Sequence, residues 1–249
     1  MSAEYFNTPH PRLLAHRGLA QHRDLDENTL EAFAAALDHG ATHLESDTQA
    51  TADGYAVLLH DPSLLRVAGE DVEIGQISLA EAQSLRLKNG GRIPTLLEAL
   101  ESFPQARFNL DVKTKAAINP TVQAIELAQA HSRILLSSFA NPIRRKALSQ
   151  LSSPVATSAS QSTVVAAYLS HKLSFGIGIS RIVRDLDAFQ IPTKKSGINF
   201  ADEKFIARLK REGVEVHFWT VNELSEAERL IAMGADGIVS DRIDLMNLR

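Results

Sequence analysis

Short apolar runs alternate with amphipathic runs along most of the chain, and this alternation limits the possible folds most strongly. The amphipathic runs predict helices, and the clearest spans 28–39, with Asn28 as its N-cap and Gly40 after its end. Repeated strand–helix units imply a parallel sheet with right-handed crossovers. The apolar runs predict eight strands, at 12–16, 42–47, 108–113, 134–138, 154–158, 188–192, 214–221 and 237–240.

Eight strands in 249 residues predict an α/β fold, a (β/α)8 TIM barrel that forms a single domain over residues 1–249. A doubly wound sheet would also give alternating elements, but its functional residues gather at one switch point. Here polar residues follow several different strands, which favours the barrel. The stretch 48–94 is too long for an ordinary loop. We expect it to be a small insertion after the second strand, with a strand at 55–60 and a helical piece at 79–87, lying over the barrel mouth.

The composition excludes several kinds of partner and chemistry. The 26 basic and 30 acidic residues give a net charge of −4, which does not suggest binding to nucleic acid or to an anionic membrane surface. The absence of cysteine excludes disulfides and zinc–thiolate sites. The polar start and the lack of an apolar stretch of about 18 residues predict a cytoplasmic protein without stable membrane association. The sequence does not indicate an oligomeric state.

Two histidines stand at the ends of apolar runs. His16 ends the first predicted strand and precedes Arg17, while His60 ends the predicted strand of the insertion and precedes Asp61. Two imidazoles can exchange protons near neutral pH, and an arginine can bind a phosphate with its forked guanidinium. The neighbouring carboxylate of Asp61 can fix the tautomer of His60. Either histidine alone is also compatible with a structural or surface role, but together they predict general acid–base catalysis on a phosphate ester.

Three carboxylates lie on the second and third predicted strands. Glu45 and Asp47 alternate with apolar or small residues, so both point to one face of their strand, and Asp111 is the natural third member of the set. Oxygen ligands of this kind suit Mg²⁺ or Ca²⁺ better than zinc. The alternative is a carboxylate pair bridged by a basic residue. Lys113, on the same face as Asp111, is predicted either to neutralise a phosphate or to form such an ion pair.

Trp219 is the only tryptophan and lies in the seventh predicted strand. Two interpretations of it stay open: a core side chain, or a pocket wall that contacts an apolar or glycerol-like part of a substrate.

Several segments together resemble the motifs of the glycerophosphodiester phosphodiesterases, in the order in which that family carries them. The resemblance covers nearly the whole chain, and the ordered set is specific even though each motif alone is weak. The segments are His16-Arg17-Gly18, Glu27-Asn28-Thr29, Glu45-Ser46-Asp47, Thr51-Ala52-Asp53-Gly54, His60-Asp61, Ile93-Pro94-Thr95-Leu96, Asn109-Leu110-Asp111-Val112-Lys113, Ser137-Ser138-Phe139, Trp219-Thr220-Val221-Asn222, and 234–241.

The resemblance implies a TIM barrel with a small insertion, a bound Mg²⁺ or Ca²⁺, and an acid–base pair of histidines. It implies hydrolysis of small-molecule glycerophosphodiesters, such as glycerophosphocholine or glycerophosphoethanolamine, to sn-glycerol 3-phosphate and an alcohol. The family usually carries glutamate where Asp111 stands, so this carboxylate is one methylene shorter than usual. For metal binding the resemblance implies Glu45, Asp47 and Asp111. It implies His16 and His60 for acid–base catalysis, and Arg17 and Lys113 for phosphate binding.

Two alternatives remain at this point. One is a related barrel phosphodiesterase that acts on a lipid, either like a lysophospholipase D or like a phosphatidylinositol-specific phospholipase C. A membrane-acting enzyme should carry exposed aromatic residues or a basic amphipathic segment, and the sequence favours neither. The other alternative is a non-catalytic barrel that binds a phosphate, against which the complete acid–base and carboxylate set argues.

Overall fold

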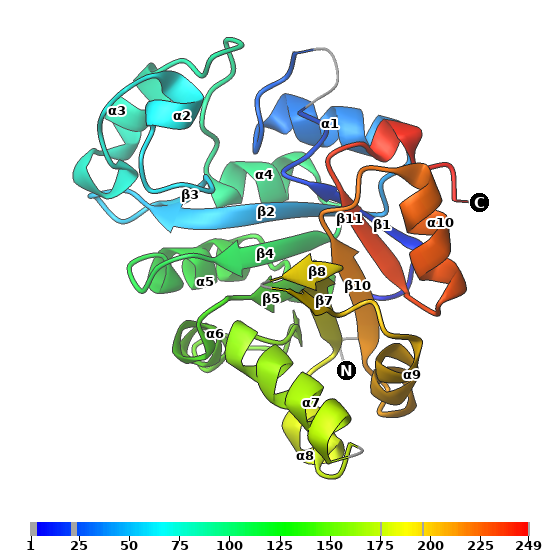
Figure 1. Cartoon of the computed structure of the whole chain (residues 1–249). Helices are drawn as coiled ribbons and strands as arrows, with labels where there is room; N and C mark the ends of the chain where they lie inside the picture. Colours follow the sequence, from blue (N-terminus) through cyan, green and yellow to red (C-terminus); the bar gives the residue numbers. More distant parts are fainter. Residues whose placement is uncertain (1–3, 21–23, 175, 196, 249) are drawn as a thin grey trace.

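The computed structural model describes residues 4–20, 24–174, 176–195 and 197–248. Within them eight parallel strands lie in the order β6-β5-β4-β2-β1-β11-β10-β7 (Figure 1), and a parallel bridge between Ser158 and Ala188 joins the two ends of this order. The predicted TIM-barrel fold is therefore confirmed. The strands are β1 (Arg12–His16), β2 (His43–Ala50), β4 (Phe108–Val112), β5 (Ile134–Ser137), β6 (Ala156–Thr157), β7 (Ala188–Pro192), β10 (Glu215–Trp219) and β11 (Gly237–Ser240).

Helices surround the strands (Figure 1), and the helices α1 and α9, for example, bury apolar side chains. In α9 the side chain of Asp202 accepts hydrogen bonds from the backbone N–H groups of Lys204 and Phe205, which caps the start of the helix. Phe205 and Leu209, four residues apart, are then buried on the same face. The helices outside the insertion are α1 (Leu30–Asp38), α4 (Leu96–Ser102), α5 (Ile118–Leu127), α6 (Asn141–Leu148), α7 (Gln161–Leu173), α8 (Ile179–Val183), α9 (Glu203–Arg211) and α10 (Leu224–Ala232).

The predicted N-cap of the first helix is wrong by one residue. Thr29 caps α1, because its side chain accepts a hydrogen bond from the backbone N–H of Ala32. Asn28 instead adopts a left-handed backbone conformation, with φ of 59°, and its Oδ1 accepts a hydrogen bond from Ser46 Oγ at 2.7 Å. Ser46 is fully buried on β2. Since a buried hydroxyl needs a partner, Asn28 serves the barrel rather than the helix end.

The stretch 48–94 forms the expected insertion. Its strand β3 (Ala56–Leu58) pairs antiparallel with β2 and ends two residues before the predicted end at position 60. The predicted helical piece is α3 (Leu79–Ser84), which starts at a capping box between Ser78 and Glu81, while α2 (Leu65–Ala68) and the short 3₁₀ helix η1 (Ile74–Gln76) complete the insertion. A small core of its own holds it together, including Val57, Leu64, Val67 and Ile74.

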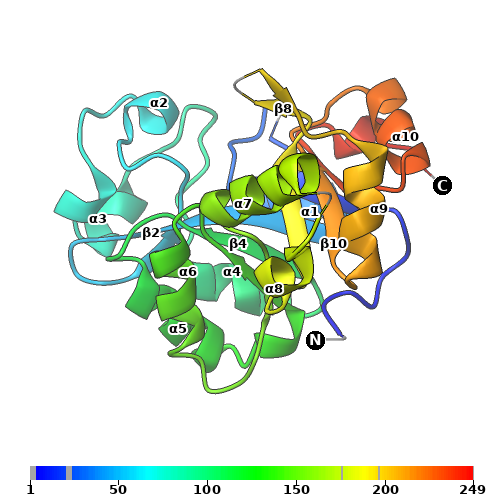
Figure 2. The same ribbon diagram turned by 60° about the horizontal axis from the view of Figure 1, so that its bottom comes forward.

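A short hairpin that the sequence patterns did not predict follows β7. It pairs β8 (Lys194–Lys195) with β9 (Ile198–Asn199). Figure 2 shows this hairpin and α2 at the same end of the molecule, away from the blue segment that leads into β1. The hairpin and the insertion therefore flank one end of the barrel.

The opposite end of the barrel is filled by a buried polar cluster. The guanidinium of Arg12 donates to both carboxylate oxygens of Glu215, at 2.9 and 2.6 Å, and His217 lies 3.0 Å from the same carboxylate. Tyr5 packs against His43 beside this cluster. Because these side chains pair with one another, we interpret the cluster as structural. A functional site is therefore expected at the carboxyl ends of the strands. In the described residues no helix is long and apolar enough to cross a membrane.

Candidate active site

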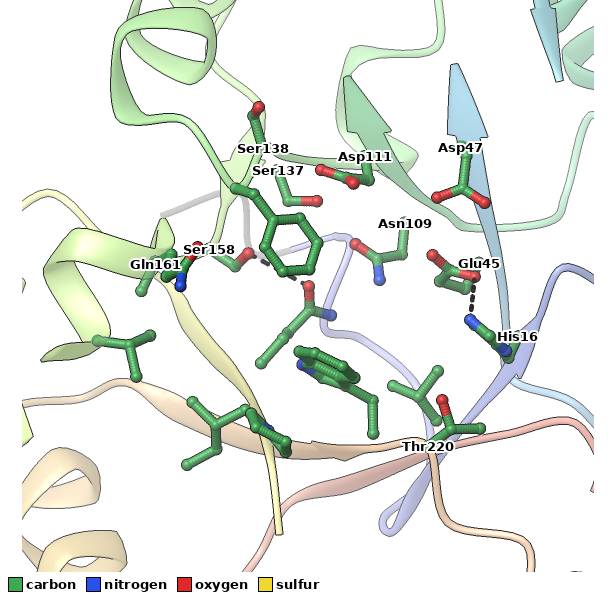
Figure 3. A pocket seen from close by; sticks show the side chains of 18 of the residues that line it. His16, Glu45, Asp47, Asn109, Asp111, Ser137, Ser138, Ser158, Gln161 and Thr220 are labelled. Carbon is green, nitrogen blue, oxygen red and sulfur yellow. Dashed lines mark hydrogen bonds and ion pairs between the residues drawn. The ribbon is translucent and has the colours of Figure 1, made fainter. Parts of the chain in front are cut away.

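A pocket of about 360 Å³ opens at the carboxyl ends of the barrel strands. Its lining includes all eight residues that the sequence predicted for catalysis, substrate binding or metal binding. Figure 3 shows His16, Glu45, Asp47 and Asp111 on one side of this pocket and Ser158 with Gln161 on the other. The eight are His16, Arg17, Glu45, Asp47, His60, Asp111, Lys113 and Trp219.

His16 ends β1 with its imidazole between two carboxylates. Its Nδ1 lies 2.6 Å from Asp241 Oδ1, and its Nε2 lies 4.0 Å from Glu45 Oε2. Burial lowers the pKa of His16, but Glu45 and the hydrogen bond to Asp241 raise it more, so the net pKa lies above its ordinary value. Asp241 is itself held by Asn222, whose Nδ2 donates to Asp241 Oδ2 at 2.8 Å. This arrangement points Nε2 into the pocket.

Glu45 and Asp47 lie on β2, two residues apart and on the same face, as predicted. Burial, with the negative charge of Asp47 as the next cause, raises the pKa of Glu45 to about 7. Burial also acts to raise the pKa of Asp47, but Lys113 and Arg17 outweigh it, so that pKa lies below its ordinary value. The two carboxylates thus differ in how readily they hold a proton.

Lys113 stands between the two aspartates rather than beside Glu45. Its Nζ lies 2.6 Å from Asp47 Oδ1 and 2.7 Å from Asp111 Oδ2. Asp47 and Asp111 are direct partners in the register of β2 and β4. Burial lowers the pKa of Lys113, but the two aspartates raise it above its ordinary value. The ion-pair interpretation of Lys113 thus holds for Asp47, with Asp111 rather than Glu45 as the second partner, whereas a contact with phosphate stays a prediction.

Three oxygen atoms around this ion pair have no hydrogen-bond donor among the described residues. Asp47 Oδ2, Asp111 Oδ1 and Asn109 Oδ1 are buried and accept no hydrogen bond. Buried oxygens that accept no hydrogen bond are costly, and Asp47 Oδ2 has only the ion pair with Arg17 Nε at 3.3 Å. All three are hard donors of the type that Mg²⁺ and Ca²⁺ bind. Across 4–20, 24–174, 176–195 and 197–248, however, no group of three or more His, Cys, Asp or Glu side chains is arranged to hold a metal ion. The donor chemistry fits a hard divalent cation, while Lys113 compensates the aspartates in its place.

His60 belongs to the insertion and reaches the pocket from beyond β3. Its Nδ1 lies 2.7 Å from Asp61 Oδ1, as the sequence suggested for a carboxylate that fixes the tautomer. Arg66 binds the other oxygen of Asp61 through Nε and also donates to both oxygens of Glu27, at 2.8 and 2.7 Å. Glu27 accepts a further bond from Arg17 Nη1 at 3.2 Å.

This chain of ion pairs connects the insertion to the barrel. Arg17 adopts a left-handed conformation, with φ of 56°, and its backbone N–H donates to Glu45 Oε2 at 3.1 Å. Its Nε lies 3.3 Å from Asp47 Oδ2 without making a hydrogen bond. Arg17 therefore places its guanidinium beside Asp47 in the pocket lining, whereas its contact with a phosphate stays a prediction.

Trp219 at the end of β10 lines the pocket, whereas its contact with a substrate stays a prediction. Its ring meets that of Phe139 edge to face, with the centroids 5.9 Å apart. The two rings form an apolar surface beside the charged part of the site.

Sequence reasoning assigned no role to Asn109, Asp241 and Phe139, although each stood in one of the quoted segments. Their contacts depend on neighbours from distant strands. For Asp241, the signal was its position directly after the last barrel strand, where a carboxylate reaches the residue at the end of β1.

The barrel and this pocket define the class of protein: a TIM-barrel enzyme with histidines, an arginine and carboxylates at the mouth. The chain belongs to the glycerophosphoryl diester phosphodiesterase family, whose family model matches residues 16–245. The predicted family and the predicted enzyme class, a glycerophosphodiester phosphodiesterase, are thereby confirmed.

Individual relatives agree with this assignment. The chain is 36% identical over 233 residues to the probable glycerophosphodiester phosphodiesterase 2 of Mycobacterium tuberculosis, covering 94% of this chain and 88% of the relative. It is 27% identical to a lysophospholipase D of Rattus norvegicus, covering 92% and 83% of the two chains. Among solved structures, an Oleispira antarctica phosphodiesterase in complex with the product sn-glycerol-3-phosphate matches with a TM-score of 0.77 and 25% identity, over 95% of each chain.

Proposed function

We propose that this pocket hydrolyses glycerophosphodiesters, such as glycerophosphocholine or glycerophosphoethanolamine, to sn-glycerol 3-phosphate and the free alcohol. One observation carries the proposal: two imidazoles line the same pocket, each with its Nδ1 bonded to a carboxylate, at 2.6 Å for His16 and 2.7 Å for His60. Both Nε2 atoms are therefore left for proton transfer. The related Oleispira antarctica structure holds sn-glycerol-3-phosphate, the product expected here.

The reaction we propose is in-line displacement at phosphorus. One histidine accepts the proton of the attacking hydroxyl, the other gives a proton to the leaving alkoxide, and the P–O bond to the alcohol breaks. Such acid–base assistance contributes roughly 10²–10⁴-fold to the rate. The attacking group is either water or a hydroxyl of the substrate's own glycerol, which would give a cyclic phosphate first.

Charge on the phosphate would be compensated by groups already fixed in place. Arg17 and Lys113 both line the pocket, and each is held by an ion pair with Asp47, at 3.3 Å for Arg17 Nε and 2.6 Å for Lys113 Nζ. Fixed cationic donors stabilise the charge that develops on the non-bridging oxygens without having to reorganise.

We also propose that a divalent cation, Mg²⁺ or Ca²⁺, is bound by Glu45, Asp47 and Asp111, with the amide oxygen of Asn109 nearby. The buried oxygens of Asp47, Asp111 and Asn109 that accept no hydrogen bond support this placement. A bound divalent cation would supply Lewis-acid stabilisation of the phosphate oxygens.

The metal proposal has a direct test. Turnover is measured after removal of divalent ions with EDTA and again after adding back Mg²⁺ or Ca²⁺. We expect chelation to abolish turnover and one of the two ions to restore it. Turnover that is insensitive to chelation would refute the metal site while leaving the histidine pair in place.

One observation favours a lipid substrate as a second candidate. Val165 of α7 lines the pocket, and Leu169 and Leu173 continue its apolar face outward, with 50% and 77% of their surface exposed. An acyl chain could follow this face, and the lysophospholipase D relative shares the fold family. A strong preference for lysophosphatidylcholine over glycerophosphocholine would establish this alternative. We expect the opposite preference.

We further propose that residues 1–249 act as one domain, because β2 runs from the barrel directly into the insertion and pairs with its strand β3.

A further inference from the structure

The pocket has two halves of different character. The catalytic half carries the histidines and the charged residues described above. The opposite half, here called the leaving-group half, is formed by Phe139, Ser158, Gln161, Gln190, Lys195 and Phe200 together with Trp219. Ser158 Oγ donates to Gln190 Oε1 at 3.2 Å in this half (Figure 3).

Among the described residues that line the leaving-group half, Lys195 is the only one with a charged side chain. It lies on β8 of the hairpin, and its Nζ stands 5.7 Å from the ring centroid of Phe139 and 6.0 Å from that of Trp219. Lys113 Nζ lies 5.6 Å from the same Phe139 ring. The ring of Phe139 thus lies near two ammonium groups, that of Lys113 at the phosphate end of the pocket and that of Lys195 at the leaving-group end.

The aromatic pair alone would attract a cation, because ring faces bind ammonium groups. In this structure the ammonium of Lys195 already occupies that position. A substrate whose alcohol ends in an ammonium group would approach a like charge there, whereas a carboxylate or phosphate would meet an opposite one. The neutral amides of Gln161 and Gln190 impose no charge preference of their own.

We propose that Lys195 selects glycerophosphodiesters whose leaving alcohol carries an anionic group. The anionic group would pair with Lys195 Nζ while the carbon atoms of the alcohol pack against Phe139 and Trp219. This assignment rests on the proposed function and ranks the substrates within it. Lys195 touches the part of the substrate that leaves, so it sets specificity and takes no part in proton transfer.

The test uses two substrates that differ by one carboxylate, glycerophosphoserine and glycerophosphoethanolamine. We expect kcat/KM for the serine substrate to exceed that for the ethanolamine substrate by about fivefold, the factor for one charge pair about 4 Å apart in water. Lys195→Gln should bring this ratio close to one, and Lys195→Glu should invert it. Added salt should reduce the ratio in the unmodified protein, because the lysine is exposed.

Lys194 provides the matched control. It is the neighbouring lysine of the same strand and is equally exposed, but it does not line the pocket. Lys194→Gln should leave the ratio unchanged. A ratio at or below one in the unmodified protein, or a ratio that responds equally to both substitutions, would overturn the role of Lys195. Failure to release sn-glycerol 3-phosphate from either substrate would instead overturn the proposed function, and this assignment with it.

Discussion

The buried carboxylate of Glu45 should make the protein less stable when no metal ion is bound. Burial and Asp47 raise its pKa from the ordinary value of 4.5 to about 7. At about 1.4 kcal/mol per pH unit, ionising Glu45 costs about 3 kcal/mol more in the folded than in the unfolded chain. Glu45→Gln removes this cost, and the amide oxygen can still accept the hydrogen bond that Arg17 N–H donates at 3.1 Å.

The sign of the pH dependence follows from which state binds the proton more tightly. The folded chain holds the Glu45 proton more tightly than the unfolded chain does, so this contribution to stability is complete below about pH 4.5. It is lost as the pH rises from 4.5 to about 7 and is constant above that range. Glu45→Gln should therefore raise the free energy of unfolding by up to about 3 kcal/mol at pH 8 and by much less at pH 5.

The free energy of unfolding is measured by urea denaturation in EDTA at pH 5 and pH 8. The dependence of this free energy on urea concentration should be the same for the unmodified protein and the variant. The exposed Glu101 on α4 supplies a control, and Glu101→Gln should change little at either pH. Adding Mg²⁺ or Ca²⁺ should stabilise the unmodified protein more than Glu45→Gln, because the ion binds only the folded carboxylates. The reasoning is refuted if Glu45→Gln is less stable at pH 8, or if its advantage is the same at both pH values.

Two further predictions concern residues that position the histidines. Asp241→Asn removes the charge at 2.6 Å from His16 Nδ1, so the pKa of His16 should fall. The limb of the kcat/KM profile that reports His16 should then move to lower pH, and kcat should drop on the order of 10²-fold. An unchanged pH profile would exclude this positioning role of Asp241. Arg66→Gln breaks the link from Asp61 to Glu27 and should lower kcat on the order of fivefold with little change in KM. Arg92→Gln breaks a comparably exposed ion pair with Glu98 and should leave kcat unchanged. An equal loss of kcat in the Arg92 and Arg66 variants would exclude a specific role of Arg66.

The barrel was predictable because its strands are buried on both faces and therefore read as apolar runs. The bounds of β1, β7 and β11 match the prediction, and the other strands differ at their ends by a few residues. The hairpin of β8 and β9 left no such pattern, since its four paired residues are exposed and include Lys194 and Lys195. The prediction of Asn28 as the helix N-cap was wrong because an Asn before a helix is typical of a cap. Here its amide oxygen instead accepts a hydrogen bond from the buried Ser46.

The residues of the site were predictable in kind, but their pairing was not. Spacing along β2 placed Glu45 and Asp47 on one face, which is a local property of a strand. The position of Lys113 between Asp47 and Asp111 depends on the register of β2 and β4, and that of Asp241 beside His16 on the pairing of β1 with β11. These contacts join positions up to 225 residues apart in the sequence, and no local pattern encodes them.

We propose that His16 and His60 together cut a glycerophosphodiester to sn-glycerol 3-phosphate. The most direct measurement follows the release of sn-glycerol 3-phosphate and ethanolamine from glycerophosphoethanolamine, in the presence of Mg²⁺ or Ca²⁺, by the unmodified protein, by His16→Ala and by His60→Ala. We expect equal amounts of the two products from the unmodified protein. Each variant should be slower by at least about 10²-fold, with an unchanged thermal midpoint. Undiminished release by either variant, or release of phosphoethanolamine and glycerol instead, would contradict the account.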